Sequence, residues 1–500
     1  MSLPEALYYA AQTRQLDKIA IEDRDIPGYT LMQRAGQATF TLLRSRWPRA
    51  RRISVVCGPG NNGGDGYVVA RLAHEASLEP LVMALGDGAR LRGDALQARK
   101  DLEAAGLQAV PFSARRLEGS DVIVDALFGT GLEREIRDDW RAAIEAMNAQ
   151  AHVPRLAVDI PSGLHADAGR VLGIAVRADA TITFIGLKTG LFTGHGPDYC
   201  GEVVFDGLGT PAGIYNGVTP AALRITQRSL VGLLTHRRRS LHKGDAGHVV
   251  VIGGAEGMSG AARLAGEAAY RTGAGLVTLA THPAHAATIS GTRPELLTHA
   301  VHDGRALRAV LKRATVIAAG PGLGQGEWGR LVLAVALEST VPKVVDADAL
   351  NILAADPVRR DDWVLTPHPG EAARLLGMTT SDIQAHRFDA VRALTEGFGG
   401  VCVLKGAGTL VAHSADHRVW LCDAGNPGMA SGGMGDVLTG LIAALLAQRL
   451  QPLDAARLGV WLHATAGDDA AAQGGEIGVM ASDLLPFMRR RLNQLTQHEA

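Results

Sequence analysis

The fold of the first half of this chain is decided by residues 53–66, which read Ile-Ser-Val-Val-Cys-Gly-Pro-Gly-Asn-Asn-Gly-Gly-Asp-Gly. The β-branched run Ile53–Cys57 predicts a buried strand, and the pattern after the glycines predicts a helix that begins near Tyr67. Glycine allows positive φ and lets a ligand approach the backbone closely. The free N–H groups and positive dipole end of the following helix suit a phosphate. A tight turn with Asx caps is the alternative, but the two Asn and one Asp among the glycines favour ligand contact.

Short apolar runs alternate with Ala- and Leu-rich helical stretches through both halves of the chain. This rhythm predicts α/β domains with mostly parallel, doubly wound sheets, the first of them Rossmann-like. A single core stops growing at roughly 250–300 residues, so we expect two domains, at 1–215 and 225–500. The predicted strands are Ile53–Cys57, Pro80–Ala84, Val122–Asp125, Leu156–Ile160, Thr181–Ile185, His248–Ile252, Leu276–Ala280, Val316–Ala319, Lys343–Asp346, Trp363–Leu365 and Val401–Leu404.

Composition and charge exclude several classes of function. The net charge of −1 leaves no basic field for a nucleic-acid backbone. The longest apolar helix candidate, Val437–Ala447, is too short for a bilayer, which takes about 20 residues. The N-terminal segment lacks the basic and apolar regions of a signal peptide. The four cysteines have no CxxC spacing, which is typical of a reducing compartment, so we expect a cytoplasmic protein with no membrane partner.

Polar residues close three strands of the first half. Asp125 and Asp159 end apolar runs, and Ser162 follows the second of them. Ligands of such folds bind beyond the carboxyl ends of the strands. An aspartate there can simply cap the next helix, but oxygens from Asn62, Asp125 and Ser162 together suit a hard cation such as potassium. No His/Cys spacing indicates zinc.

The second half carries a stronger signal near its end, where Gly425–Asp436 precedes the apolar helix Val437–Ala447. The glycine turn directs backbone N–H groups toward an anion, as phosphoryl transfer requires. Asp436 either caps this helix or also accepts a proton from an attacking hydroxyl, and we predict that it does both. There is no GxxxxGK[ST] motif, which excludes a P-loop kinase.

Four further loops follow strands of the second half. His368 stands between two prolines, which stiffen its loop, and Lys405 precedes glycines whose amides suit a nucleotide phosphate. The four loops are Gly320–Gly324, Asp346–Asn351, Thr366–Glu371 and Lys405–Thr409.

In these motifs the chain resembles the bifunctional NAD(P)H-hydrate repair enzymes, and the resemblance extends along nearly all of its length. PGNNGGDG, VDALFGTGL and DIPSGL match the signatures of the epimerase domain of that family. HKGDAGHVVVIGG, GPGLG, DADALN, LTPHPGE, LKGAGT and GNPGMASGGMGD match those of its dehydratase domain, which has a ribokinase-like α/β fold.

The resemblance implies two linked reactions on NADH or NADPH that has been hydrated on its nicotinamide ring. The epimerase domain interconverts the R and S hydrates. The dehydratase domain phosphorylates the hydroxyl of the S form with ADP, and elimination of the phosphate gives NAD(P)H, AMP and phosphate. Potassium at the epimerase site and magnesium with the nucleotide are the implied cofactors, and a homo-oligomer is expected.

The same resemblance assigns roles to individual residues. It implies Asp159 and Asp436 as catalytic groups, and Asn62, Asp125 and Ser162 as potassium ligands. The implied substrate contacts are Asn61, Asn62, Gly63, Gly64, Asp65, Gly129, Thr130, Gly131, Leu132, Glu133, Arg134, Glu135 and Asp159 in the first domain, and Ala261, Gly322, His368 and Asp436 in the second. The implied nucleotide contacts are Lys405, Gly406, Ala407, Gly408, Thr409 and Gly435.

Two residues depart from the family pattern, and two other functions remain open at this point. His165 stands where an acidic residue is common, and Met434 where the glycine turn more often has threonine, which can alter nucleotide affinity. One alternative is a ribokinase-like vitamin or sugar kinase fused to a non-catalytic nucleotide-binding module. The other is a non-enzymatic scaffold, against which the intact Asp125, Asp159 and Ser162 argue.

Overall fold

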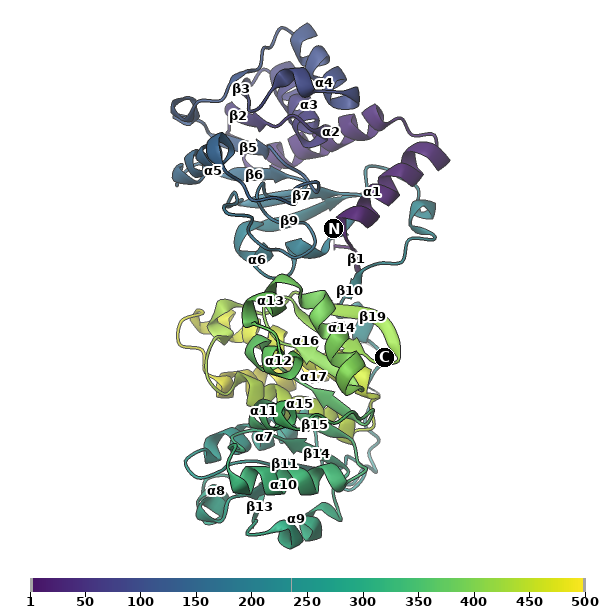
Figure 1. Ribbon diagram of the computed structural model, residues 1–500, viewed down its shortest axis with the longest axis vertical. Helices are drawn as coiled ribbons and strands as arrows, with labels where there is room; N and C mark the ends of the chain where they lie inside the picture. The colour runs from purple at the N-terminus through teal and green to yellow at the C-terminus, as the bar shows by residue number, and fades with distance from the viewer. Residues whose placement is uncertain (1–2, 235, 498–500) are drawn as a thin grey trace. The chain divides into compact units, whose positions relative to one another are not determined.

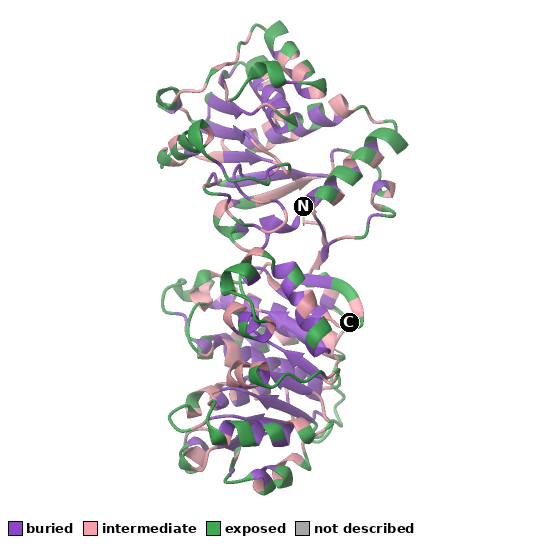
Figure 2. Ribbon diagram, in the orientation of Figure 1, coloured by how far each residue is buried: buried purple, intermediate pink, exposed green. Residues whose placement is uncertain are grey.

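The computed structural model describes residues 3–234 and 236–497, and these form two compact units, Met1–Leu223 and Arg224–Ala500. The outer limits of the two predicted domains, at residues 1 and 500, lie outside the described residues. Buried strands run through the middle of each unit and exposed helix faces surround them (Figures 1 and 2). Among the described residues, no helix combines the length and apolar character of a membrane span.

The first unit contains a parallel sheet with the strand order β4-β3-β2-β5-β6-β7-β9. The order reverses between β2 and β5, which makes the carboxyl ends of these two strands the expected place for a ligand. Its strands are β2 (Arg52–Cys57), β3 (Glu79–Ala84), β4 (Val110–Pro111), β5 (Val122–Ala126), β6 (Arg155–Val158), β7 (Ala180–Phe184) and β9 (Glu202–Asp206).

Both faces of this sheet are covered, because alternate residues of its strands point in opposite directions. Val55 belongs to the apolar cluster beneath α2, α3 and α4, and Val56 to the cluster beneath α5. The helices are α2 (Gly28–Arg46), α3 (Asn61–Glu75), α4 (Gly93–Ala104) and α5 (Asp138–Ala149). The predicted doubly wound architecture of the first unit is therefore confirmed.

The helix α3 begins at Asn61, so the prediction of a start near Tyr67 is wrong. The glycines of this segment serve close packing rather than positive φ. A Cβ on Gly63 would lie 2.0 Å from the carbonyl oxygen of Gly58, and one on Gly66 would lie 2.7 Å from Cβ of Ala126. The first contact is local and the second is tertiary, and the absence of a side chain at both glycines lets this polar segment pack as the first turns of a helix.

A small N-terminal element lies beside the sheet of the first unit (Figure 1). Strand β1 (Ala6–Tyr8) pairs in parallel with β8 (Leu187–Lys188) and antiparallel with β10 (Ala222–Arg224). Helix α1 (Ala10–Lys18) follows at once, and its first backbone N–H donates to Asp167 over 2.6 Å. The pairing of β1 with β8 places α1 next to Lys188.

The second unit contains a sheet in which seven parallel strands are followed by two antiparallel ones, in the order β13-β12-β11-β14-β15-β16-β17-β18-β19. The order reverses between β11 and β14. The strands are β11 (His248–Ile252), β12 (Leu276–Thr281), β13 (Leu297–Ala300), β14 (Val316–Ala319), β15 (Lys343–Val345), β16 (Trp363–Leu365), β17 (Val401–Leu404), β18 (Thr409–His413) and β19 (Asp416–Cys422).

Helix α15 (Met434–Ala447) is the central helix of the second unit, and nearly all of its residues are buried. It packs against α7, α16 and β14, and a helix that is apolar all round belongs in such a core. The other helices of this unit are α7 (Ser259–Thr272), α8 (Ala286–Thr292), α9 (Gly304–Leu311), α10 (Glu327–Glu338), α11 (Ala347–Ala355), α12 (Pro369–Leu376), α13 (Thr380–Ala385), α14 (Arg387–Phe398), α16 (Pro452–Gly474) and α17 (Leu484–Gln497).

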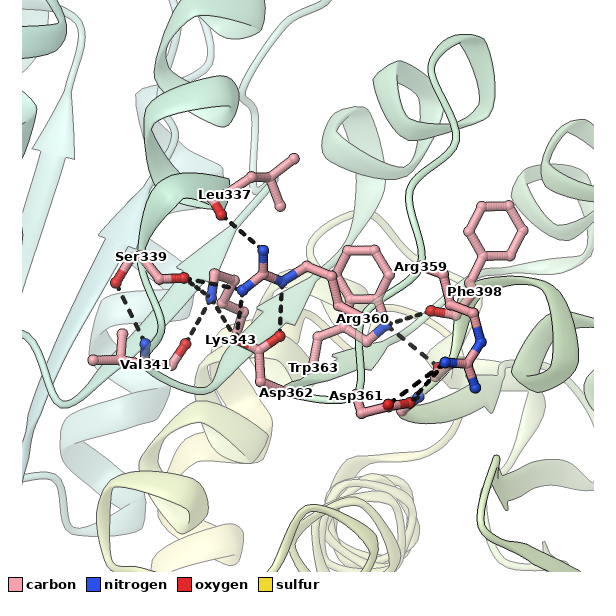
Figure 3. Close-up of polar contacts among 12 residues, drawn as sticks. Leu337, Ser339, Val341, Lys343, Arg359, Arg360, Asp361, Asp362, Trp363 and Phe398 are labelled. Carbon is pink, nitrogen blue, oxygen red and sulfur yellow. Dashed lines mark hydrogen bonds and ion pairs between the residues drawn. The ribbon is translucent and has the colours of Figure 1, made fainter.

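A buried lysine secures the end of α10 (Figure 3). The Lys343 ammonium is 1% exposed and donates to the carbonyls of Ser339 (2.6 Å) and Val341 (2.7 Å) and to Asp362 (2.9 Å). Arg360 donates to the same carboxylate and to the Leu337 carbonyl. These groups satisfy carbonyls that the helix end leaves without partners.

Replacing Asp362 with alanine is expected to destabilise the second unit by about 2 kcal/mol, because Lys343 would remain buried without its counter-charge. The shift of the urea unfolding midpoint measures this cost. The neighbouring Asp361→Ala is the matched control, since the Asp361 side chain is 67% exposed. Equal stabilities of the two variants would contradict the role given to Asp362.

Candidate active sites

A cavity of about 680 Å³ opens in the first unit, and residues that follow β2 and β5 line it. Its walls include the first turn of α3, the segment after β5, and residues of α1, α2 and β8. Among the described residues, Gly63, Gly64 and Glu135 are not part of its lining. The sequence-predicted residues that do line it are Asn61, Asn62, Asp65, Gly129, Thr130, Gly131, Leu132, Glu133, Arg134 and Asp159.

Asp125 and Ser162 lie together behind this cavity and are both fully buried. The Ser162 hydroxyl donates to Asp125 over 2.6 Å, and the Ser162 backbone N–H donates to the other carboxylate oxygen over 2.7 Å. Burial raises the pKa of Asp125 to about 6, and the bonds from Ser162 oppose that rise. Among the described residues, no cationic side chain forms an ion pair with this carboxylate.

Asn62 supplies a further oxygen at the cavity wall. Its side chain is buried, and neither its Oδ1 nor its Nδ2 has a hydrogen-bond partner among the described residues. Such a group costs free energy unless something binds it. A Cβ built on Gly129 would lie 3.5 Å from Cγ of Asn62 and 3.3 Å from Oδ2 of Asp159, which places these side chains side by side.

Asp159 is held by a lysine that the sequence analysis missed. The Lys188 ammonium, 1% exposed, forms an ion pair with Asp159 and donates to Thr183 Oγ1 (2.9 Å) and the Phe184 carbonyl (3.2 Å). Asp159 also has a φ of 68°, in the left-handed region that non-glycine residues rarely adopt. Strain of this kind gathers at functional sites, and here it turns a carboxylate toward the cavity.

Asp17 and Asp65 also line the same cavity, and the pKa values of both are raised. Burial is the main reason that the pKa of Asp17 rises to about 6, with Lys188 opposing and Asp159 assisting the rise. Burial and the charges of Asp159 and Asp17 also raise the pKa of Asp65. Asp17 lies on α1 and has no motif around it, so no sequence signal could have found it.

In the second unit, Asp436 lies in the first turn of α15, behind Gly433, which has a φ of 90°. Burial raises the pKa of Asp436 to about 7, and the nearby carboxylate of Asp346 adds to the rise while Lys405 opposes it. A carboxyl group that titrates near neutrality is suited to accept a proton from a hydroxyl.

Lys405 forms ion pairs with two carboxylates of this site. Its ammonium lies 2.8 Å from Asp346 and 3.7 Å from Glu371. Burial lowers the pKa of Lys405, but the carboxylates of Asp346 and Glu371 outweigh that effect and raise it. Thr439 donates to the second oxygen of Asp346 over 2.7 Å, which fixes the pair. A Cβ on Gly435 would lie 3.3 Å from the Lys405 nitrogen, so glycine keeps the approach to it open.

His368 caps α12 at the edge of the same site. Its Nδ1 accepts hydrogen bonds from the backbone N–H groups of Gly370 (3.0 Å) and Glu371 (3.4 Å), and Glu371 accepts one from the His368 N–H. Burial, followed by the charge of Lys405, lowers the pKa of His368. The other ring nitrogen, Nε2, lies 3.3 Å from Oε1 of Glu371, and the side chain is half exposed at the edge of the site.

Ala261, in α7, lies against Gly322, in the loop after β14. A Cβ on Gly322, whose φ is 56°, would lie 3.1 Å from Cβ of Ala261. Asp348 accepts a hydrogen bond from the Gly324 N–H over 2.9 Å, and its charge contributes to the pKa of Asp436. The loop Gly320–Gly324 is thus joined to the site around Asp436.

Arg387, which the sequence analysis also missed, holds the segment Lys405–Thr409 through its backbone carbonyls. Arg387 is 3% exposed, and its guanidinium donates to the carbonyls of Leu404 (3.3 Å), Lys405 (3.3 Å) and Gly408 (3.2 Å). Burial lowers its pKa to about 10. These bonds fix the backbone carbonyls of the segment from the side of α14.

The two departures from the family pattern lie away from the ligand-facing surfaces. His165 accepts hydrogen bonds from the N–H groups of Asp167 (3.2 Å) and Ala168 (3.3 Å) and is not among the cavity-lining residues. The Met434 side chain is 7% exposed.

Comparison with known proteins gives matches over the full chain. A family model described as NAD(P)H-hydrate dehydratase matches residues 249–490, and one described as YjeF-related protein N-terminus matches residues 28–190. The chain is 48% identical to the bifunctional NAD(P)H-hydrate repair enzyme Nnr of Coxiella burnetii over 97% of this chain and 99% of that protein. It is 44% identical to the Escherichia coli enzyme of that name over 99% of this chain and 95% of that protein.

A solved structure matches the second half alone. The ADP/ATP-dependent NAD(P)H-hydrate dehydratase of Bacillus subtilis, co-crystallised with ATP and Mg²⁺, aligns with a TM-score of 0.50 and 29% identity. The alignment covers 54% of this chain and 98% of that one. It confirms the ribokinase-like fold predicted for the second half.

The fold and the two sites define a bifunctional α/β enzyme, with a carboxylate-lined cavity in one unit and a phosphoryl-transfer site in the other. The full-length matches identify it further: the chain belongs to the family of bifunctional NAD(P)H-hydrate repair enzymes. It combines an epimerase domain with an NAD(P)H-hydrate dehydratase domain, as the resemblance predicted. This assignment replaces both the kinase fused to a binding module and the non-enzymatic scaffold.

Proposed function

We propose that this enzyme repairs hydrated NADH and NADPH, that its first unit interconverts the R and S hydrates, and that its second unit dehydrates the S form with ADP. The observation that carries the proposal is the position of Asp436, a carboxyl group with a pKa of about 7 at the glycine turn beside Lys405. Such a group can take the proton of a hydroxyl while neighbouring cations and amides receive a phosphoryl group.

The dehydratase reaction then proceeds in two steps. Asp436 accepts the proton of the substrate hydroxyl as its oxygen attacks the β-phosphorus of ADP, and AMP leaves. The phosphate ester is next eliminated with a proton from the neighbouring ring carbon, which restores the double bond. We assign Ala261, Gly322 and His368 to the hydrate, and Gly435 with the segment Lys405–Thr409 to the nucleotide.

Magnesium accompanies the nucleotide in this proposal. The Bacillus subtilis dehydratase was co-crystallised with ATP and Mg²⁺. Among the described residues, no group of three or more His, Cys, Asp or Glu side chains forms a metal cage. A small cation that keeps most of its waters and binds mainly through phosphate oxygens fits this arrangement.

In the first unit, we assign Asp159 as an acid/base group and the predicted cavity-lining residues as substrate contacts. We further assign a potassium ion to Asn62, Asp125 and Ser162. The unpartnered Oδ1 of Asn62 and the Asp125 carboxylate, which forms no ion pair among the described residues, support this ligand set, because both can bind a cation. A bound potassium ion would supply a fixed positive charge beside the substrate.

Replacing potassium with tetramethylammonium at equal ionic strength is expected to lower both the epimerase rate and the unfolding temperature of the first unit. An ion present at about 100 times its dissociation constant stabilises a fold by about 2.7 kcal/mol. In Asp125→Asn, the two salts are expected to give the same unfolding temperature. Equal rates and unfolding temperatures of the native enzyme in the two salts would remove potassium from the site.

We also propose a cytoplasmic homo-oligomer. The four cysteines are free and buried, which suits a reducing compartment, and the apolar side chains of Ile477 (100% exposed) and Met480 (61% exposed) support contact with another copy. Analytical ultracentrifugation and cell fractionation test these two statements.

The experiment for the function supplies a mixture of both hydrates with Mg²⁺ and K⁺, and with ADP or ATP in separate reactions. Recovery of all the NADH absorbance with one nucleotide, together with release of inorganic phosphate, is the expected result. A stable phosphate ester as the final product would instead identify a kinase. Recovery that stops at one epimer would leave only the dehydratase.

A further inference from the structure

The cavity of the first unit contains an acidic residue outside the segment matched by the epimerase family model. That match begins at residue 28, whereas Asp17 lies on α1, which ends at Lys18. Asp17 nevertheless lines the same cavity as Asp65, Asp159 and Lys188. A role of Asp17 in this cavity rests on the proposed epimerase function.

Specific packing brings α1 to the cavity. Leu7 pairs with Leu187 and Tyr8 with Lys188 across the β1–β8 ladder. A Cβ on Gly186 would lie 3.1 Å from the Tyr8 ring and 3.2 Å from Oγ1 of Thr13, so α1 can approach this strand because residue 186 is glycine. The N-terminal element is therefore a built part of the cavity wall.

The groups that face Asp17 come from four elements: Arg14 from α1, Asp65 from α3, Asp159 from the turn after β6, and Lys188 from β8. Lys188 donates hydrogen bonds to Asp159, Thr183 and Phe184, and its positive charge also lowers the pKa of Asp17, although by less than burial raises it. Burial and the charge of Asp159 leave Asp17 with a pKa of about 6. One cavity thus holds a lysine-paired carboxylate, Asp159, and a second carboxyl group, Asp17, whose pKa is raised.

A proton donor and a proton acceptor in one cavity suit the chemistry of the substrate. Protonation of the ring enamine of NADH gives a C=N⁺ iminium ion, and water adds to its carbon, so the hydroxyl of the hydrate stands beside the ring nitrogen. Loss of that hydroxyl as water regenerates the iminium ion. Addition of water to the opposite face then gives the other epimer.

We propose that Asp17 is a catalytic residue of the epimerase and exchanges protons with the substrate in partnership with Asp159. Asp17 gives its proton to the hydroxyl, the C–O bond breaks, and the nitrogen lone pair forms the C=N bond. Water then forms a new C–O bond on the other face, its proton passes to Asp159, and the C=N electron pair returns to nitrogen. The enzyme is left with Asp159 protonated and Asp17 ionised, which is the form that catalyses the reverse reaction.

The test follows the two phases of hydrate consumption by the full-length enzyme with ADP and Mg²⁺. The S form disappears directly, and the R form disappears at the rate of epimerisation. In Asp17→Asn, the first phase is expected to stay unchanged and the second to slow by about a hundredfold in kcat, with little change in KM. Glu22→Gln is the matched control, since Glu22 is an exposed carboxylate that does not line the cavity.

Three further readouts separate a catalytic role from a structural one. The native epimerase rate is expected to fall as the pH rises past about 6, where Asp17 loses its proton, and Asp17→Asn is expected to lose this dependence. Asp17→Glu keeps the carboxyl group and is expected to regain at least a tenth of the native rate. In H₂¹⁸O, the native enzyme is expected to label the hydroxyl as the epimers interconvert.

A native rate in Asp17→Asn, no recovery in Asp17→Glu, or epimerisation without ¹⁸O would each overturn the proposal. A native enzyme that consumes only the S form would instead show that the proposed epimerase function itself fails.

Discussion

Asp436→Asn is expected to lower the dehydratase rate by about a thousandfold while the epimerase rate stays at its native value. The asparagine amide cannot accept the proton of the substrate hydroxyl, but it has nearly the same size and leaves the N–H groups of the glycine turn in place. Lys405 retains Asp346 and Glu371 as partners, so the charge balance of the site changes little. Return of NADH absorbance measures the first activity, and chromatography of the two hydrates measures the second.

The pH dependence of the native enzyme tests the same assignment. Asp436 acts in its ionised form, so the dehydratase rate is expected to rise as the pH increases through about 7. The raised pKa also means that the folded state binds the proton of Asp436 more tightly than the unfolded state does. The stability that this proton gives to the folded state is lost as the pH rises through 7. At pH 8, Asp436→Asn is therefore expected to be no less stable than the native chain.

Two results would contradict this role of Asp436. One is a dehydratase rate in Asp436→Asn within tenfold of the native value, and the other is a native rate that does not depend on pH between 6 and 8. Asp389→Asn is the control, because Asp389 is an exposed carboxylate of α14 that is 78% accessible. It is expected to keep both activities.

Most of the central strands of both units could be predicted from local sequence, because a buried parallel strand is a continuous apolar run. His248–Ile252, Val316–Ala319, Trp363–Leu365 and Val401–Leu404 coincide with the observed strands, and the other predicted strands differ from theirs by one or two residues at one or both ends. The sequence analysis predicted no strand at the positions of β1, β4, β8, β9, β10, β13, β18 and β19. The start of α3 could not be predicted from the sequence pattern. Gly63 belongs to the helix because its missing side chain leaves room for the Gly58 carbonyl, and this contact exists only in the folded chain.

The residues that hold the sites in place were harder to predict than those at the strand ends. Asp159 directly follows a predicted strand, and Asp436 directly precedes a predicted helix, both in glycine-rich motifs. Such positions indicate a ligand site. Lys188 and Arg387 stand in no such motif, and they become recognisable only when folding buries them against Asp159 and against the carbonyls around Lys405. Burial of a long charged side chain is a tertiary property that local sequence does not encode.

Asp159→Asn is expected to have the opposite effect to the Asp436 variant. Its epimerase rate is expected to fall by about a thousandfold and its dehydratase rate to stay unchanged. The amide oxygen can still accept the hydrogen bond from Lys188, but this buried ammonium loses its counter-charge, so the variant is expected to be less stable and its rates are measured on protein shown to be folded. With a mixture of hydrates, NADH recovery is expected to stop once the S form has been consumed. A blank without enzyme corrects for spontaneous epimerisation.

Mixing Asp159→Asn with Asp436→Asn makes this test sharper. Neither variant alone is expected to recover the R hydrate, but each keeps one complete set of catalytic groups in its own unit. An equimolar mixture is therefore expected to restore full recovery, with the Asp436 variant supplying the S form and the Asp159 variant consuming it. A mixture that still stops at the S fraction would mean that one of the two sites requires a carboxylate from the other unit of the same chain, and the separate assignment of Asp159 and Asp436 would be wrong.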